Sequence, residues 1–545
     1  MTSEVVEIKI LGTTDVHGHI RPHTYFEGER EQDLGLAKIA TILKREREKT
    51  PHVLFVDSGD LLQGSPLLDW FRRHGVPDAV DPMVETFNNL NPSAWNVGNH
   101  DFNYGLDLLF KAQKDARYPF VSANVYWART PDLVFDPFHL CDVGGVKVGF
   151  LGATPPGVAI WDKAHVEGRM DFGDIVTAFA LHVPVMKAKG ADLVIGLPHT
   201  GLGGDGEYGP TYGGYGKGSG LPPENVGLVL AREIAHLDAL FLGHTHQAHA
   251  MQENGVAIVQ AEMGGKRIAC VHFVLERFRD GWQVVKKEVS TISTAGVEPD
   301  PDILELSAVA HKETLAYVSA PLATTTSNWV ARNERVEDTP LMDLINAVQL
   351  ERTGSQLSAV SAFNTDIGLT AGPISLAQIA AIYPVENTLV VIRVTGKQLR
   401  EFLEYSARYF ASYQAGASIF DPDVKGYNFD MVAGVDYDID ITRPVGSRIV
   451  KLEYLGAPVN DEMTFSIAMN SYRQRGGGGY EMIRNAPVIY SAEENIRELL
   501  IEYLREKGSI EPGDVFKESW RIVPQGLIDT STFKYLATKP EEAKV

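Results

Sequence analysis

Short apolar runs alternate with longer amphipathic stretches over the N-terminal half of the chain. The apolar runs predict strands, because near-continuous apolar segments are typical of strands buried on both faces of a sheet. The amphipathic stretches predict helices. The predicted strands are 5–11, 53–57, 146–151, 192–197, 238–242 and 256–260, and the predicted helices are 36–48, 106–116, 175–189 and 226–235. This alternation predicts a layered α/β domain.

The pattern changes near residue 296. Residues 291–301 are small, polar and contain proline, and residues 302–318 have the periodicity of a helix. Further on, helices are predicted at 341–350 and 396–410 and strands at 388–394 and 464–469. We therefore predict an N-terminal domain over residues 1–295, a linker helix over 296–320 and a second α/β domain over 321–545.

Composition limits the partners of the chain. Its 545 residues are too many for one core, and 44% hydrophobic and 22% charged residues are globular values. No stretch reaches the length of a transmembrane helix. The formal net charge of -21 argues against a nucleic-acid polymer or an anionic membrane as partner. A small phosphorylated ligand stays compatible with this charge, because bound cations reverse the local field. The oligomeric state is left open.

Metal-ligand residue types stand beside apolar runs in five places. The patches are Asp15-Val16-His17, Asp57-Ser58-Gly59-Asp60, Gly98-Asn99-His100-Asp101, Pro198-His199 and Gly243-His244-Thr245-His246. A lone histidine is usually structural, but five of the 16 histidines fall in these patches. Carboxylate, amide and imidazole groups gathered at strand ends build metal sites in α/β sheets. The joint arrangement therefore predicts a metal site, with Asp60 as a carboxylate able to bridge two ions.

The order of the five patches resembles that of the calcineurin-like metallophosphoesterases. Longer segments resemble the 5′-nucleotidase family within that group, and in particular its branch that acts on 2′,3′-cyclic nucleotides and 3′-nucleotides. These segments are 63–66, 98–105, 160–163, 387–391 and 427–430. The resemblance covers nearly the whole chain. It implies a four-layer α/β/β/α metallophosphoesterase domain followed by a C-terminal α/β 5′-nucleotidase-type domain that binds the nucleotide.

The resemblance also implies two divalent metal ions. One would be held by Asp15, His17, Asp60 and His246, and the other by Asp60, Asn99, His199 and His244. Two ions can clamp a phosphate and lower the pKa of a shared water, whose hydroxide would attack phosphorus. The mixed nitrogen and oxygen ligands suit Mn, Zn, Co or Fe.

The family's catalytic histidine corresponds to His100, which would stabilise the developing charge or protonate the leaving group. Many 5′-nucleotidases pair this histidine with an aspartate three residues later. This chain has Asn103 there, as does the cyclic-phosphodiesterase branch. An asparagine can orient the imidazole by a hydrogen bond but does not raise its basicity as a carboxylate does.

Three residues of the second domain are candidates for binding the nucleotide. Tyr472 matches one of the two family positions that sandwich the base, and aromatic rings stack on bases. The opposite position falls near Val385, so Tyr383 is the candidate for that wall. Asn364 loosely matches a family residue near the base and ribose. The ribose-binding aspartate of the family is replaced by Gly478.

The leading hypothesis is a 2′,3′-cyclic-nucleotide 2′-phosphodiesterase and 3′-nucleotidase activity. A 5′-nucleotidase or nucleotide-sugar hydrolase is the alternative, and a nucleotide-binding protein without turnover is a remote one. Residues 1–10 lack the basic start and apolar core of a signal peptide. That leaves open a cytoplasmic protein or a form without its leader, since members of the family are often periplasmic or attached to the cell wall.

Overall fold

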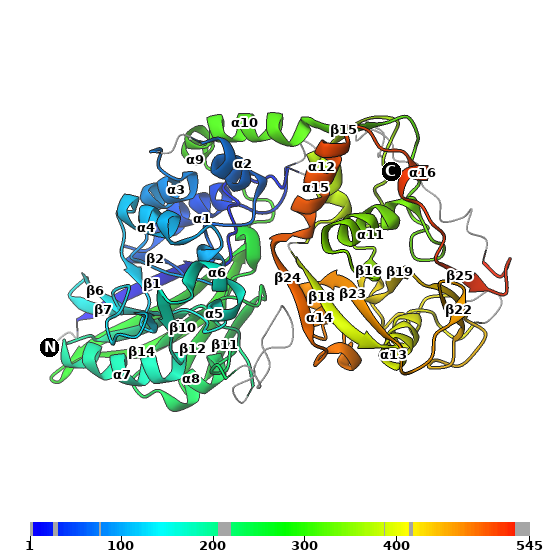
Figure 1. The fold of residues 1–545 in the computed structure, drawn as a ribbon. Coiled ribbons are helices and arrows are strands. Elements are labelled where there is room, and N and C mark those ends of the chain that lie inside the picture. The colour runs from blue at the N-terminus through cyan, green and yellow to red at the C-terminus, as the bar shows by residue number, and fades with distance from the viewer. Residues whose placement is uncertain are drawn as a thin grey trace. The chain divides into compact units, whose positions relative to one another are not determined.

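The computed structural model describes residues 4–25, 31–75, 78–204, 220–385, 387–413 and 418–528 (Figure 1). Among these residues, the chain up to Leu315 forms one compact unit and the chain from Ala316 forms a second. The division falls inside a helix, whereas the sequence placed the whole linker at 296–320. No helix among the described residues is both long and apolar enough to span a membrane.

Two six-stranded sheets form the centre of the first unit, in the orders β14-β13-β1-β2-β3-β4 and β11-β12-β10-β9-β7-β6. The first consists of β1 (Val5–Thr13), β2 (Val53–Asp57), β3 (Ala94–Asn96), β4 (Phe120–Val121), β13 (Arg267–Phe278) and β14 (Gly281–Ser293). The second consists of β6 (Phe138–Val143), β7 (Val146–Ala153), β9 (Leu193–Pro198), β10 (Ala239–Leu242), β11 (His249–Glu253) and β12 (Val256–Gln260). Strands β5 (Val125–Trp127) and β8 (Met170–Phe172) form a separate pair.

Strand direction matters for the site. Strands β1, β2, β3 and β4 are parallel to one another. Strands β7, β9, β10 and β12 are parallel as well. The carboxyl ends of each parallel set therefore share one edge of their sheet, the edge at which α/β proteins place their ligands.

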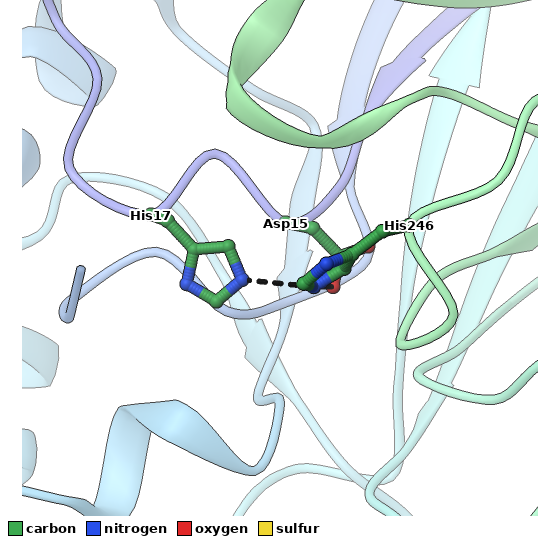
Figure 2. Close-up of side chains that lie close together, drawn as sticks. All are labelled: Asp15, His17 and His246. Atoms are coloured by element: carbon green, nitrogen blue, oxygen red, sulfur yellow. Dashed lines mark hydrogen bonds and ion pairs between the residues drawn. The ribbon is translucent and has the colours of Figure 1, made fainter. Parts of the chain in front are cut away.

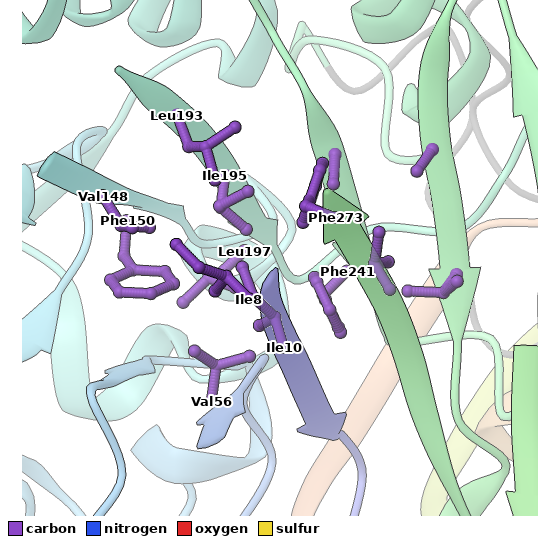
Figure 3. Packing of buried hydrophobic residues seen from close by; sticks show 14 of the residues in the cluster. Ile8, Ile10, Val56, Val148, Phe150, Leu193, Ile195, Leu197, Phe241 and Phe273 are labelled. Atoms are coloured by element: carbon purple, nitrogen blue, oxygen red, sulfur yellow. The ribbon is translucent and has the colours of Figure 1, made fainter. Parts of the chain in front are cut away.

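The two sheets pack face to face through alternate side chains (Figure 3). Ile195 and Leu197 of β9 lie in the core between the sheets with Ile8 of β1, whereas Val194 faces the helical layer. On the first sheet Val56 points into this core, and its neighbour Phe55 packs against Phe87 of a covering helix. Because successive strand residues point to opposite faces, each sheet is buried on both sides.

Helices cover the outer faces. On the first sheet they are α1 (Leu36–Lys49), α2 (Pro66–His74), α3 (Pro82–Leu90) and α4 (Leu106–Asp115). Helices α7 (Ile175–Ala188) and α8 (Gly227–Glu233) pack on the second sheet through Phe179, Val183 and Leu230. The short helices α5 (Val158–Trp161) and α6 (Lys163–Val166) follow β7. The predicted four-layer α/β/β/α fold is confirmed.

The predicted linker segment contains two helices, α9 (Pro301–Leu306) and α10 (Ala308–Ser319), which are separated at Ser307. The guanidinium group of Arg21 donates to the Leu304 carbonyl at 2.6 Å, and the Ser307 hydroxyl donates to the Ile303 carbonyl at 2.8 Å. Side chains thus bond to backbone carbonyls of α9 beside the point where the two helices separate.

The second unit contains a five-stranded sheet, β19-β16-β23-β18-β24, a four-stranded sheet, β22-β21-β20-β25, and the pair β15-β17. The strands are β15 (Pro321–Thr325), β16 (Leu357–Ser361), β17 (Gly372–Ser375), β18 (Thr388–Thr395), β19 (Asp430–Ala433), β20 (Asp436–Asp440), β21 (Ile449–Tyr454), β22 (Ala457–Pro458), β23 (Thr464–Asn470), β24 (Val488–Asn495) and β25 (Trp520–Val523). The helices are α11 (Pro340–Thr353), α12 (Leu376–Ile382), α13 (Gly396–Ala407), α14 (Ser471–Gln474), α15 (Ile496–Lys507) and α16 (Pro512–Val515). The predicted second α/β domain is confirmed in its fold class.

The core between the sheets gives a stability prediction. Phe273 of β13 is fully buried there, so Phe273→Ala should lower the free energy of unfolding of the first unit by about 3–5 kcal/mol. Phe278 lies on the same strand but is 45% exposed, and Phe278→Ala should cost far less. Urea unfolding followed by fluorescence measures both. Equal losses in the two variants would contradict the packing described above.

Candidate metal centre

Every predicted metal ligand follows the carboxyl end of a parallel strand. Three loops of the first sheet and two of the second carry them. Asp15 and His17 follow β1, Asp60 follows β2, Asn99 follows β3, His199 follows β9, and His244 and His246 follow β10. Because the two sheets face each other, these loops meet above one edge of the core.

Two overlapping groups of these side chains could each hold a metal ion. The first is Asp15, His17 and His246 (Figure 2), in which Nε2 of His17 and Nε2 of His246 lie 3.2 Å apart. Nε2 of His246 is also 3.4 Å from Oδ1 of Asp15. The second is Asp15, Asp60 and His199, with His199 Nε2 2.9 Å from Asp60 Oδ2 and 3.7 Å from Asp15 Oδ1.

Both carboxylates lie between the two groups. Asp15 belongs to each of them, and Asp60 Oδ2 lies 4.0 Å from Nε2 of His17 as well as 2.9 Å from Nε2 of His199. The sequence pointed to Asp60 alone as the bridging carboxylate. The structure places Asp15 equally close to both groups, so the allotment of each residue to one ion stays a prediction.

The remaining two predicted ligands stand beside the second group. Asn99 Oδ1 is 2.9 Å from His244 Nδ1, and the His244 and His199 rings are 5.3 Å apart between centroids. On its far side, His244 Nε2 lies 2.5 Å from Oε1 of Glu224. A carboxylate behind a histidine fixes the orientation of a metal-binding ring. Glu224 was not predicted, because nothing in its local sequence indicates a partner 20 residues away.

The donor set fits divalent metal ions. Asp60 Oδ2 and His199 Nε2 are buried and lie 2.9 Å apart as an ion pair, and Asp15 Oδ1 lies 3.7 Å from the same ring nitrogen. A metal ion can take the place of the proton of a buried imidazole that lies between two carboxylates. Carboxylate oxygens with imidazole nitrogens are a set that Mn, Zn, Co and Fe accept.

The electrostatics favour ionised carboxylates at the centre. Burial raises the pKa of Asp15, but the nearby His199 and His246 outweigh burial and hold the pKa at about 2. Burial likewise opposes the charged form of His199, but Asp60 and Asp15 raise its pKa to about 10. The two carboxylates are thus ionised and stabilised by neighbouring positive charge, which a metal ion would supply in place of the His199 proton.

The backbone is strained at these ligands. Twelve described non-glycine residues have a positive φ, and five of them are Asp15, His17, Asp60, His244 and His246. Such conformations cost on the order of 1–3 kcal/mol each and are concentrated at functional sites. Gly59 has a φ of +107°, and a Cβ there would lie 2.5 Å from the backbone nitrogen of Gly98, so only glycine allows these loops to approach.

Asp101 holds two of the loops together. Its buried carboxylate accepts the backbone N–H groups of Asp60, Leu61, Leu62 and Gly98 at 2.8–3.0 Å. Burial, followed by the proximity of Asp60, raises its pKa to about 6. Asp101 was not among the predicted site residues. No local pattern shows that it joins the loop after β2 to the loop after β3.

His100 lies at the margin of the cluster. Its backbone N–H donates to Asp60 Oδ1 at 2.7 Å, and its ring centroid is 5.3 Å from that of His17. Its Nδ1 is 2.7 Å from Oδ1 of Asn103. The structure therefore brings the predicted catalytic pair together beside the predicted ligands.

The three predicted nucleotide contacts lie in the second unit. Tyr472 of α14 is half-buried. Tyr383 is only 2% exposed and packs edge-on against Phe363 at 5.2 Å between centroids. The Asn364 side chain donates to the Ala381 carbonyl at 3.0 Å. Their roles in binding stay predictions.

Two sheets face each other, and their parallel strands end beside carboxylate, imidazole and amide side chains. This arrangement defines a metallophosphoesterase. The family model of the calcineurin-like phosphoesterases matches residues 8–248, and that of the 5′-nucleotidase C-terminal domain matches residues 317–485. The chain belongs to the calcineurin-like phosphoesterase family, in the group that carries the 5′-nucleotidase C-terminal domain. Its cofactors are divalent metal ions.

Similar proteins match this chain over nearly its whole length. The 2′,3′-cyclic-nucleotide 2′-phosphodiesterase/3′-nucleotidase of Haemophilus influenzae is 29% identical over 99% of this chain and 91% of its own. The trifunctional nucleotide phosphoesterase YfkN of Bacillus subtilis is 28% identical over 98% of this chain, which spans only 40% of that protein.

Solved structures share the fold. The calcineurin-like phosphoesterase structure of YfkN has 30% identity and a TM-score of 0.53, and covers 58% of this chain and 99% of its own. A 5′-nucleotidase precursor from Thermus thermophilus has 23% identity and a TM-score of 0.58 over 95% of this chain and 100% of its own.

Asp101 allows a test of how the centre is assembled. Asp101→Asn replaces an acceptor-only carboxylate by an amide whose NH2 faces backbone donors. We expect the free energy of unfolding to fall by about 1–3 kcal/mol and bound metal to decrease. Metal analysis and urea unfolding measure the two effects. Asp107→Asn, on the exposed face of α4, is the control and should change stability by less than about 0.5 kcal/mol. Full metal content in Asp101→Asn would contradict the role given to this carboxylate.

Proposed function

We propose that this metallophosphoesterase hydrolyses 2′,3′-cyclic nucleotides to 3′-nucleotides and then removes the 3′-phosphate. The observation that carries the proposal is the His100–Asn103 pair, which lies beside the Asp60 and His17 side chains. The names of relatives that match over nearly the whole chain support the same substrate class.

The chemistry follows from the side chains around the phosphate. When bound, the divalent ions supply positive charge to the phosphate oxygens and activate the attacking water. Asn103 Oδ1 accepts from Nδ1 of His100 at 2.7 Å, so Nε2 is the ring nitrogen that exchanges a proton with substrate.

In the first reaction water adds to phosphorus and gives up one proton as the bond from phosphorus to O2′ breaks, and Nε2 of His100 takes up a proton and delivers it to the leaving O2′. In the second reaction the same residues act on the bond to O3′. One histidine can serve both steps, because each leaving group is a ribose oxygen on the same edge of the sugar.

The nucleoside would be held by the second unit. Tyr472 supplies the aromatic face on which a base stacks, and Asn364 and Tyr383 complete the proposed site.

A 5′-nucleotidase or nucleotide-sugar hydrolase is the second candidate, because the same metal centre serves it. Asn103 in place of an aspartate beside His100 favours the first candidate. The two groups of possible metal ligands, with the His100–Asn103 pair beside them, favour an enzyme over a nucleotide-binding protein without turnover.

A substrate panel tests the proposal. Purified protein of known metal content is assayed for phosphate release and chromatographic products with 2′,3′-cyclic AMP, 3′-AMP, 5′-AMP and a nucleotide sugar. We expect turnover of the first two and a 3′-nucleotide intermediate from the cyclic substrate. A strong preference for 5′-AMP would overturn the proposal in favour of the second candidate.

The metal centre is tested by Asp60→Ala and His199→Ala. Each substitution removes a predicted metal ligand and adds no volume to the core, so both variants should fold. Activity should fall by about 10²–10³-fold or more, which is the loss from removing one group that stabilises a transition state. Circular dichroism and metal analysis accompany the assay. Retained turnover in either variant would remove these residues from the site.

A further inference from the structure

Behind Asn103 lies a carboxylate to which the mechanism above gives no role. Asp162 is 6% exposed and stands between α5 and α6. Its Oδ1 accepts from Nδ2 of Asn103 at 2.7 Å, while Oδ1 of the same amide is 2.7 Å from Nδ1 of His100. The three side chains form one hydrogen-bonded chain that ends at the ring beside the metal ligands.

The Asp162 side chain does not make the helix-capping hydrogen bond that its position predicts. Asp162 is the N-cap residue of α6, where an aspartate normally accepts a backbone N–H of the first turn. It makes no such bond here. The carboxylate turns instead toward Asn103, and its Oδ2 is buried without a hydrogen-bond partner among the described residues.

The segment that carries Asp162 touches the site at a second point. The ring of the preceding residue, Trp161, packs on the His244 ring at 5.7 Å between centroids. The α5–α6 segment is thus anchored against a predicted metal ligand on one side and against Asn103 on the other.

The direction of the hydrogen bonds follows from the chemistry of the groups. An ionised carboxylate only accepts, so the amide must turn its NH2 toward Asp162 and its oxygen toward His100. That oxygen in turn requires a hydrogen on Nδ1 of His100. Without Asp162 the amide could rotate and present its NH2 to the ring, which would favour the opposite tautomer.

We propose that Asp162 is a positioning residue that sets the ring tautomer of His100 through the amide of Asn103. The inference rests on the catalytic role proposed for His100. An aspartate directly against the ring would orient it and also raise its basicity. The Asn103 amide instead fixes the orientation of the His100 ring, while the Asp162 carboxylate stays one residue further from that ring.

The chain offers a swap that tests the proposal. Asp162→Asn should lower kcat by about 10–100-fold with little change in KM or metal content, because the tautomer is no longer fixed. Asn103→Asp should also lower kcat, since it sets two buried carboxylates against each other. The double variant Asn103→Asp with Asp162→Asn places an acceptor at the ring and a donor behind it. We expect its kcat to exceed that of both single variants.

The control is Glu167→Gln, which removes a charge from the exposed end of the same segment and should leave kcat unchanged. Losses that simply add in the double variant would overturn the proposal, because a merely structural Asp162 predicts that result.

A spectroscopic measurement separates this inference from the substrate assignment. Histidine-ring nitrogen NMR spectra of the zinc-loaded protein report the tautomer of each ring, and His100→Gln identifies the signals of His100. We expect Nδ1–H in the parent and a shift toward Nε2–H in Asp162→Asn. Unchanged His100 signals in Asp162→Asn would overturn the inference whatever the substrate. A parent that hydrolyses none of the nucleotides would overturn the proposed function and leave this measurement intact.

Discussion

The metal centre depends on one buried carboxylate that bonds to backbone amides of two loops. Asp101 accepts four backbone N–H groups, three from the loop after β2 and one from the loop after β3. These bonds hold Asp60 in its left-handed conformation and bring Gly59 against Gly98. Bonds of a charged acceptor to backbone amides are among the stronger ones in proteins, and in a dry interior they fix position closely. This junction fixes the position of Asp60 relative to the loop that carries Asn99.

The strain of the ligand loops is carried by the core below them. The five predicted ligands with positive φ together cost several kcal/mol. The two sheets meet in a continuous apolar core that includes Ile8, Ile195 and Phe273, and each fully buried side chain of this kind contributes about 1.5–3 kcal/mol. This packing holds each strand in place up to its last residue. The first residues after a strand lie beyond the core, so their backbone can take a strained conformation that directs a side chain at a ligand.

The sequence predicted the parts of the site that are local and missed those that are not. Ligand types next to apolar runs are visible in one dimension, so Asp15 and His199 could be placed at strand ends without coordinates. Glu224 could not, since its contact with His244 exists only after β10 folds against the loop before α8. Ser307 shows the same limit in the fold: residues 302–318 are mostly helical as their periodicity predicts, yet two helices separate at Ser307, where Arg21, far away in the chain, donates to Leu304 and Ser307. Asp15 belongs to both ligand groups for the same reason, because only the packing of the two sheets brings these groups together.

The distribution of charge around the centre follows from what it must bind. A phosphate dianion is repelled by carboxylates, and this chain carries a net charge of -21. Of the buried aspartates nearby, Asp15 and Asp60 have a lowered pKa, because the surrounding imidazoles outweigh the effect of burial. Burial raises the pKa of Asp57, Asp101 and Asp162 instead. The charged form is thus most strongly favoured in the two aspartates of the predicted ligand groups, where cations neutralise it. An asparagine between His100 and Asp162 is consistent with the same requirement, because it orients the ring without placing another anion against the phosphate.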